Sequence, residues 1–158
     1  MSKWRHEAIK QLPQYREMIE TSDALGELWL NLWFEFKLAY EKHPKDTQVI
    51  AGIYTYAAWC WHGSDFKGNH INLNTVVFHL FYENLPRESV ICRDMANWLC
   101  LSEFEVLLLG PLSYGIGADE SILMAAGFRQ AKKNRVGDGI ERCAKLTIQA
   151  PKPGVLGL

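Results

Sequence analysis

The chain has 158 residues, 48% of them hydrophobic and 22% charged, which is enough for one globular domain with its own core and excludes a fibrous sequence. Residues 1–128 carry 10 Lys and Arg against 16 Asp and Glu, a net charge of −6, whereas residues 129–158 carry 7 against 2, a net charge of +5. An acidic body with a basic tail is not typical of a nucleic-acid-binding domain, whose basic side chains gather on a folded face.

The first predicted helix runs from Lys3 to about Ile19, because apolar residues recur along one helical face. Pro13 should bend this helix or split it in two. A second helix is predicted from about Ala24 to Lys42, with its N-cap supplied by the polar residues 21–23. A third is predicted from about Thr47 to Trp61, with Asp46 or Thr47 as its cap.

Large side chains mark the face through which the second and third helices are expected to pack. In the second helix, aromatic residues stand at i, i+4, i+7 and i+11, which is one stripe along a helix: Trp29, Trp33, Phe36 and Tyr40. The third helix repeats the rhythm with Ile50, Ile53, Tyr54, Ala57 and Trp61. We therefore expect the aromatic stripe to pack against the third helix and to bury a large apolar area.

The rest of the chain is also predicted to be helical. After a polar loop over residues 62–69, Asn72 should cap a fourth helix, although the β-branched residues 75–77 leave a strand as the less favoured alternative. Further helices are predicted from Pro86 to about Leu99, from the capping box that begins at Ser102, and from about Asp119 to Phe128. The basic tail, residues 129–158, should be frayed or disordered.

These elements predict an all-α fold with one helical domain over residues 1–128 and six to seven helices. Short breaks between consecutive helices favour antiparallel neighbours. Both a compact antiparallel helical bundle and a short α-solenoid of stacked αα-hairpins fit this pattern. The bundle is preferred, because the helix pairs 24–61 and 72–99 are only loosely similar, whereas a solenoid usually has clear internal repeats.

The sequence predicts a cytoplasmic protein. The charged residues Lys3, Arg5 and Glu7 stand where a signal peptide needs an apolar run, and the apolar run 105–110 is too short to cross a bilayer. The cysteines form no CxxC pair and are most simply reduced thiols: Cys60, Cys92, Cys100 and Cys143. We expect no metal and no other cofactor, because the cysteines and histidines do not occur in the closely spaced pairs that structural zinc needs.

Several segments resemble a widespread group of small bacterial proteins that share a domain of unknown function. The residues that carry this resemblance are Leu28, Trp29, Leu32, Phe36, Ala39 and Tyr40, then Ile50, Ile53, Tyr54, Tyr56, Ala57, Trp59 and Cys60, then Phe81 to Pro86, and finally Arg93, Asp94, Met95 and Trp98. The resemblance covers about Leu12 to Phe128 and implies a compact helical protein with no assigned activity. The family pattern has an acidic residue where this chain has Ala58, so any role of that carboxylate is missing here.

One pair of residues has the spacing of a reactive site. His79 and Glu83 stand at i and i+4 with Tyr82 beside them, so they could share a metal or form an acid–base pair. A structural ion pair has the same spacing and is favoured, because an isolated H-x3-E occurs often without any function. Cys60 is expected to pack as a small hydrophobe at the C-terminal end of its helix, where a thiolate is not stabilised.

A second candidate is a protein-binding site at the end of the third helix. Trp59 and Trp61 lie about 200° apart on a helix, so both cannot face the same core. One of them is either exposed, as an anchor for a partner, or covered by another element such as the N-terminal helix. We therefore predict a partner-binding site at Trp59, Trp61, His62, Tyr82 and Glu83. The leading hypothesis is a non-enzymatic protein-interaction module of the immunity, adaptor or regulatory type. The alternative is a small enzyme with an acid–base or metal-assisted site at His79 and Glu83; the partner and the oligomeric state stay open.

Overall fold

The computed structural model of the chain describes residues 1–63, 72–85, 89–99 and 103. All regular structure in these residues is helical, which confirms the all-α prediction for them. The elements are α1 (Lys3–Gln11), the 3₁₀ turn η1 (Pro13–Tyr15), α2 (Arg16–Thr21), α3 (Leu25–Glu41), α4 (Thr47–His62), α5 (Leu73–Leu80), the 3₁₀ turn η2 (Tyr82–Asn84) and α6 (Ser89–Trp98). The helices predicted from Ser102 and Asp119, and the predicted tail, lie outside the described residues.

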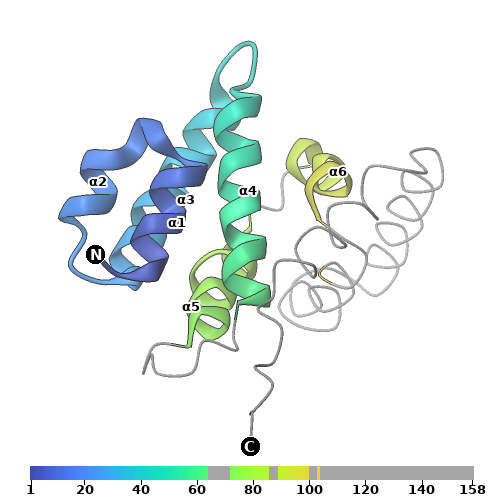
Figure 1. Cartoon of the computed structure of the whole chain (residues 1–158). Helices are drawn as coiled ribbons and strands as arrows, with labels where there is room; N and C mark the ends of the chain where they lie inside the picture. Colours follow the sequence, from blue (N-terminus) through green and yellow to red (C-terminus); the bar gives the residue numbers. More distant parts are fainter. Residues whose placement is uncertain (64–71, 86–88, 100–102, 104–158) are drawn as a thin grey trace, which may run out of the picture.

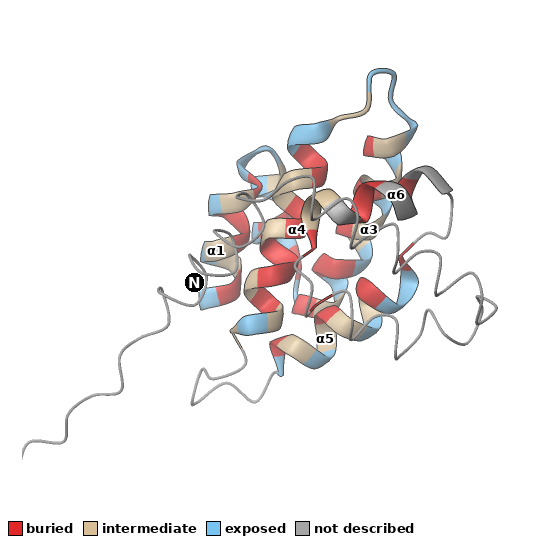
Figure 2. Ribbon diagram, turned by 90° about the vertical axis from the view of Figure 1, so that its right-hand side faces the viewer, coloured by how far each residue is buried: buried red, intermediate tan, exposed pale blue. Residues whose placement is uncertain are grey.

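Helix α4 occupies the centre of the described part and contacts α1, α3, α5 and α6. Figure 1 shows it standing between the N-terminal helices on one side and α6 on the other. The buried residues lie on the faces that these helices turn toward one another (Figure 2). None of the described helices combines the length and the apolar character that a bilayer-spanning helix requires.

Local sequence signals set most helix ends correctly. The predicted break at Pro13 is confirmed, since α1 ends before it and η1 begins with it. Two predicted caps are confirmed as well. The Asp46 carboxylate accepts a hydrogen bond from the backbone N–H of Val49 at 3.2 Å, and the Asn72 side chain accepts one from the backbone N–H of Thr75 at 3.2 Å.

The predicted cap of α3 is wrong. Ala24 occupies the N-cap position, where it makes no side-chain bond. The Ser22 hydroxyl instead donates backward to the carbonyl oxygen of Met18 at 2.7 Å. The Glu27 carboxylate, in the first turn of α3, accepts a hydrogen bond from the backbone N–H of Asp23 at 2.7 Å. The backbone at the N-terminal end of α3 is thus bonded by a carboxylate within the helix. The polar side chains of residues 21–23, which precede the helix, were expected to take this role.

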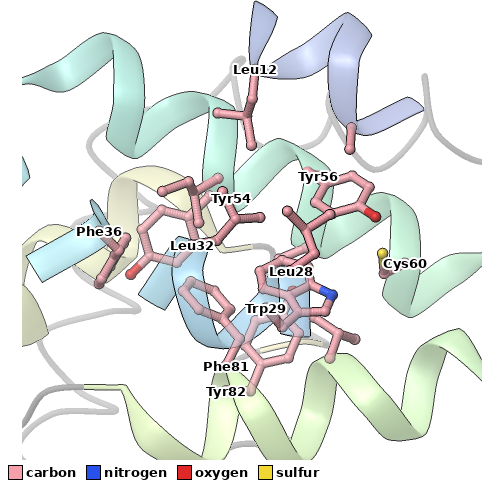
Figure 3. Packing of buried hydrophobic residues seen from close by; sticks show 14 of the residues in the cluster. Leu12, Leu28, Trp29, Leu32, Phe36, Tyr54, Tyr56, Cys60, Phe81 and Tyr82 are labelled. Carbon is pink, nitrogen blue, oxygen red and sulfur yellow. The ribbon is translucent and has the colours of Figure 1, made fainter. Parts of the chain in front are cut away.

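The core contains closely packed aromatic rings from α3, from α4 and from the residue that follows α5 (Figure 3). The Trp29 ring of α3 stacks on Tyr56 of α4 with centroids 5.1 Å apart, and Phe36 meets Tyr54 edge to face at 5.3 Å. Phe81, just after α5, lies 5.2 Å from both Trp29 and Phe36. The predicted packing of the aromatic stripe against α4 is therefore confirmed for Trp29 and Phe36, and Phe81 completes it. Edge-to-face and offset contacts of this kind add to the energy of apolar burial.

Candidate functional site

The two tryptophans of the predicted partner-binding site are partly covered by the protein's own rings. Trp59 is half-buried and its ring stacks on Tyr56, with centroids 6.1 Å apart. Trp61 is half-buried between Phe78 at 6.0 Å and Tyr82 at 5.8 Å. Both rings therefore already contribute to packing within the fold, and each offers a partner only part of its surface.

The other three predicted residues differ in their access to solvent. Tyr82 is only 2% exposed, so it offers a partner almost no surface. His62 is exposed, with its Nε2 atom 3.4 Å from the Glu103 carboxylate. Glu83 is exposed and lies 2.8 Å from the His79 ring. The structure thus brings Trp61 and Tyr82 into contact and leaves His62 and Glu83 at the surface, and the partner-binding role of the five residues stays a prediction.

His79 and Glu83 form a hydrogen-bonded pair at the surface. The Nδ1 atom of His79 lies 2.8 Å from Oε2 of Glu83, and their side chains are 58% and 42% exposed. Water at this exposure screens the pair, so the site lacks the desolvation that tunes catalytic groups. In the part of the chain that the structure describes, no three His, Cys, Asp or Glu side chains converge as metal ligands would. The favoured structural interpretation of this pair fits the geometry better than an acid–base site.

Cys60 is a buried, unreactive thiol in the described structure. Its side chain is fully buried beside Tyr56 and Trp29 (Figure 3). Burial raises the pKa of the Cys60 thiol far above its usual range, and the hydrogen bonds from the neighbouring rings only partly oppose this shift. A thiol that stays protonated is a poor nucleophile, so Cys60 behaves as the small apolar residue that the sequence predicts.

The sequence does not single out Asp94, yet its buried carboxylate gathers four partners. The Oδ2 atom accepts from the Tyr40 hydroxyl, the Trp98 indole N–H and the Lys45 ammonium, each at 2.9 Å, and Oδ1 accepts from the Asn97 amide. These contacts join α3, the loop before α4, and α6. The only signal in the sequence was the presence of Tyr40, Asp94 and Trp98 among the residues that carry the family resemblance.

The charge states of Asp94 and Tyr40 indicate that the cluster has a structural role. Burial alone would raise the pKa of the Asp94 carboxyl, but its four hydrogen bonds outweigh burial and hold the pKa below its usual value of 3.8. Burial, together with the hydrogen bond to Asp94, raises the pKa of Tyr40 well above its usual range. Near neutral pH the carboxylate is saturated with donors and the phenol keeps its proton. Neither group is available for proton transfer, so the cluster ties helices together.

Helix α3 carries three exposed large apolar side chains. Leu30 is 53% exposed, Phe34 61% and Leu38 51%, and the three stand at i, i+4 and i+8. We call these three residues the α3 outer row. At about 100° per residue, Glu27 and Glu41 fall within about 20° of Phe34 on the same helical face. The α3 outer row is therefore an apolar strip with one carboxylate at each end.

Contacts to other segments hold both edges of the α3 outer row. On one edge, the Trp33 indole N–H donates to the backbone carbonyl of Asn84 at 2.9 Å, and its ring meets Phe34 edge to face at 5.3 Å. On the other edge, the Tyr15 hydroxyl donates to Glu35 at 2.8 Å. These bonds fix α3 between η1 and η2, so its outer row is presented on an anchored helix.

A signal for the α3 outer row was present in the sequence. Besides the predicted core stripe, α3 has leucine and phenylalanine on its remaining sides, so it is apolar almost all round. A helix of this kind is covered on every side only when it lies at the centre of a fold. The central position belongs to α4, so the other described helices leave one side of α3 uncovered.

No protein-family model, no curated protein and no solved structure matches the chain. The resemblance of the segments between Leu12 and Phe128 to bacterial proteins with a domain of unknown function therefore stays a prediction. The described residues define the class of protein to this extent: it is helical, it has an aromatic core, and one anchored helix exposes an apolar row.

Proposed function

We propose that the protein is a non-enzymatic protein-interaction module of the immunity, adaptor or regulatory type, and that it binds its partner through the α3 outer row. The observation that supports this proposal is the joint exposure of Leu30, Phe34 and Leu38 on one helical face. Single exposed apolar residues are ordinary, but a contiguous row of large ones on a solvent-facing helix is characteristic of an interaction surface.

The energy of such an interface must come from more than these three residues. Full burial of a large apolar side chain contributes about 1.5–3 kcal/mol, so three half-exposed ones supply roughly 2–4 kcal/mol before the cost of association. Glu83, predicted from the sequence as a partner contact, lies beside Asn84, whose carbonyl holds Trp33 at the edge of the row. The bond between Trp33 and Asn84 therefore links the helix that carries the α3 outer row to η2, the turn that carries Tyr82 and Glu83 of the predicted site.

The helix count, the bundle architecture and the location of the protein belong to the same proposal. We propose that the complete chain forms a bundle of six to seven helices. A bundle is supported because α4 contacts α1 as well as α3, α5 and α6, whereas a solenoid repeat contacts only its sequence neighbours. The cytoplasmic location remains a prediction from the sequence.

Affinity capture with quantitative mass spectrometry tests the proposed function. Wild-type protein and the variants Phe34→Ser and Leu38→Ser serve as bait in an extract of the native host, with Gln14→Ser as the control because Gln14 is exposed outside α3. We expect the two row variants to lose at least one protein that the wild type and the control retain. Thermal melting by circular dichroism checks that each bait is folded.

Two outcomes would contradict the proposal. If both row variants retain every partner of the wild type, the α3 outer row is not the binding surface. A parallel Trp61→Ala bait separates the two candidate surfaces, since loss of the partner with this variant alone would move the site to the end of α4. If the wild type retains no protein above the level of an empty support, the interaction-module hypothesis itself fails.

A further inference from the structure

We propose that the α3 outer row receives a basic amphipathic α-helix of a separate protein, lying along α3. This inference rests on the proposed function, because it names the partner class of the same surface. Three features of the surface support it: the spacing of its apolar side chains, the absence of any backbone edge that could pair with a strand, and the charges at its ends.

The spacing of the row suits a second helix. Residues four apart on an α-helix are about 6 Å apart along its axis, so Leu30, Phe34 and Leu38 form a ridge about 12 Å long. Ridges of this i±4 type fit into the grooves between side chains of another helix. An apolar residue on each of three successive turns of the partner would match this ridge.

An extended peptide does not suit the same surface. A strand gains backbone hydrogen bonds from its partner when it pairs with the edge of a sheet, and elsewhere on the surface its N–H and C=O groups bond to water. The described residues contain no strand, and the backbone of α3 is bonded within its own helix. An extended partner would therefore gain no backbone hydrogen bonds from α3, whereas a helical partner forms its own.

The charges at the ends of the row favour a basic partner. Glu27 and Glu41 are exposed and are 14 residues apart, which is about 21 Å along the helix axis. Two bases lie near the row. Lys37 lies over the Trp33 ring with its Nζ atom 5.2 Å from the ring centroid. Lys42, which follows Glu41, pairs with Asp46 at 2.9 Å. The net charge of −6 over residues 1–128 adds a longer-range attraction for a cationic helix.

A second copy of the chain is a poorer occupant. A two-fold antiparallel pairing centred on Phe34 would place Leu30 against Leu38, but it would also place Glu27 against Glu41 at both ends. Like charges at such positions oppose association.

The chain's own basic tail fits less well than a separate helix. Residues 129–158 supply Arg129, Lys132, Lys133 and Arg135, but Gly137 and the other glycines and prolines that follow oppose a helix of three apolar turns. An anionic membrane is disfavoured by the two carboxylates at the ends of the row.

Fluorescence anisotropy on the full chain tests the inference. The probe is a fluorescein-labelled 18-residue peptide of Leu, Ala and Lys, with Leu on one helical face over four turns and Lys at both ends of that face. One control peptide has Glu in place of every Lys, and a second has the same composition in scrambled order. We expect the basic amphipathic peptide to bind at least tenfold more tightly than either control.

Matched variants locate the binding on α3. We expect Phe34→Ser to weaken binding of the basic peptide at least tenfold. The double variant Glu27→Gln/Glu41→Gln should weaken it about fivefold to tenfold and reduce its salt dependence. Glu17→Gln removes an exposed carboxylate outside α3 and should leave the affinity within twofold of wild type.

Each other outcome overturns the inference. Equal binding of the basic and acidic peptides, or equal effects of the Glu27/Glu41 and Glu17 changes, would exclude charge complementarity. If Phe34→Ser does not change the affinity, the peptide is held only by unspecific attraction to an acidic protein and does not bind at the α3 outer row. A dimer in sedimentation that Phe34→Ser dissociates would identify a second copy as the occupant, and binding to phosphatidylserine vesicles that the same variant abolishes would identify a membrane. If host capture still depends on Phe34 when the peptide does not bind, only this inference fails and the proposed function stands.

Discussion

Replacement of Gly52 by alanine should destabilise the fold, although alanine is the better helix former. Gly52 lies in α4 where the end of α1 approaches it most closely. A Cβ atom at this position would lie 2.6 Å from Cδ2 of Leu12 and 2.9 Å from the backbone carbonyl oxygen of Gln11. Leu12 is completely buried, and the Gln11 oxygen belongs to the main chain, so neither atom can move aside without displacing α1 from α4.

The size of the effect follows from two opposing terms. Overpacking of a filled core by a methyl group costs about 1–3 kcal/mol, whereas replacing glycine by alanine inside a helix contributes about 1 kcal/mol of stability. The Gly52→Ala variant should therefore lose up to about 2 kcal/mol in the free energy of unfolding. Gly26→Ala is the matched control, since its Cβ would lie 3.5 Å from Cδ1 of Leu80, an ordinary contact. That variant should be unchanged or more stable by up to about 1 kcal/mol.

Urea unfolding followed by tryptophan fluorescence measures both variants against the wild type. The midpoint should fall for Gly52→Ala and stay level or rise for Gly26→Ala, with the slope unchanged in both. A Gly52→Ala protein as stable as Gly26→Ala would refute the reasoning, because it would mean that α1 does not approach α4 as closely as the distances to Leu12 and Gln11 require.

Two further predictions concern buried polar groups. Asp94→Asn should lower the free energy of unfolding by about 1–3 kcal/mol at pH 7, because the amide keeps the shape of the carboxylate but loses its charge-assisted bonds. Since the folded-state pKa of Asp94 is depressed below 3.8, its contribution is fully present above that value and is lost as pH falls through the lower folded-state pKa. In urea unfolding the gap between variant and wild type should stay constant from pH 7 to 5 and close below about pH 4; a gap that widens in acid would contradict this. Cys60, buried and with a raised thiol pKa, should react with iodoacetamide at pH 7 only when the protein unfolds, as peptide mapping by mass spectrometry can test; rapid labelling of the native protein would show that the site is open.

The features that the sequence predicted correctly depend on neighbouring residues. Pro13 has no N–H for a helix interior, and Asp46 and Asn72 carry side-chain acceptors three residues before the donors that they satisfy. The predicted cap at residues 21–23 is wrong because the hydroxyl and the carbonyl oxygen of Ser22 both bond to residues outside α3. Its hydroxyl donates to the end of α2, and its carbonyl oxygen accepts from Arg5, 17 residues earlier in the chain. A contact with a distant residue of this kind has no local signature.

The Asp94 cluster shows why a site can escape sequence analysis. Tyr40 and Asp94 are 54 residues apart, and Lys45 reaches the same carboxylate from the loop before α4. Each residue by itself is ordinary, and only the packing of α6 beside α4 brings them together. The contact between His79 and Glu83 is the opposite case, since the two residues are four apart and their spacing alone suggested it.

The same distinction explains where the exposed apolar surface lies. The spacing of Trp59 and Trp61 indicated correctly that one helical face cannot bury both, but it could not show that Tyr56, Phe78 and Tyr82 would cover parts of their rings. Both α3 and α4 are apolar on more than one side, so the sequence alone does not show which of them lies at the centre of the fold. In the fold, α4 has helices on several sides, whereas the main helix neighbours of α3 are α4 and α5. The unmatched apolar side chains therefore lie on α3. Packing among the described residues uses Trp29 and Phe36, and it leaves Leu30, Phe34 and Leu38 exposed, which is the surface that we propose a partner covers.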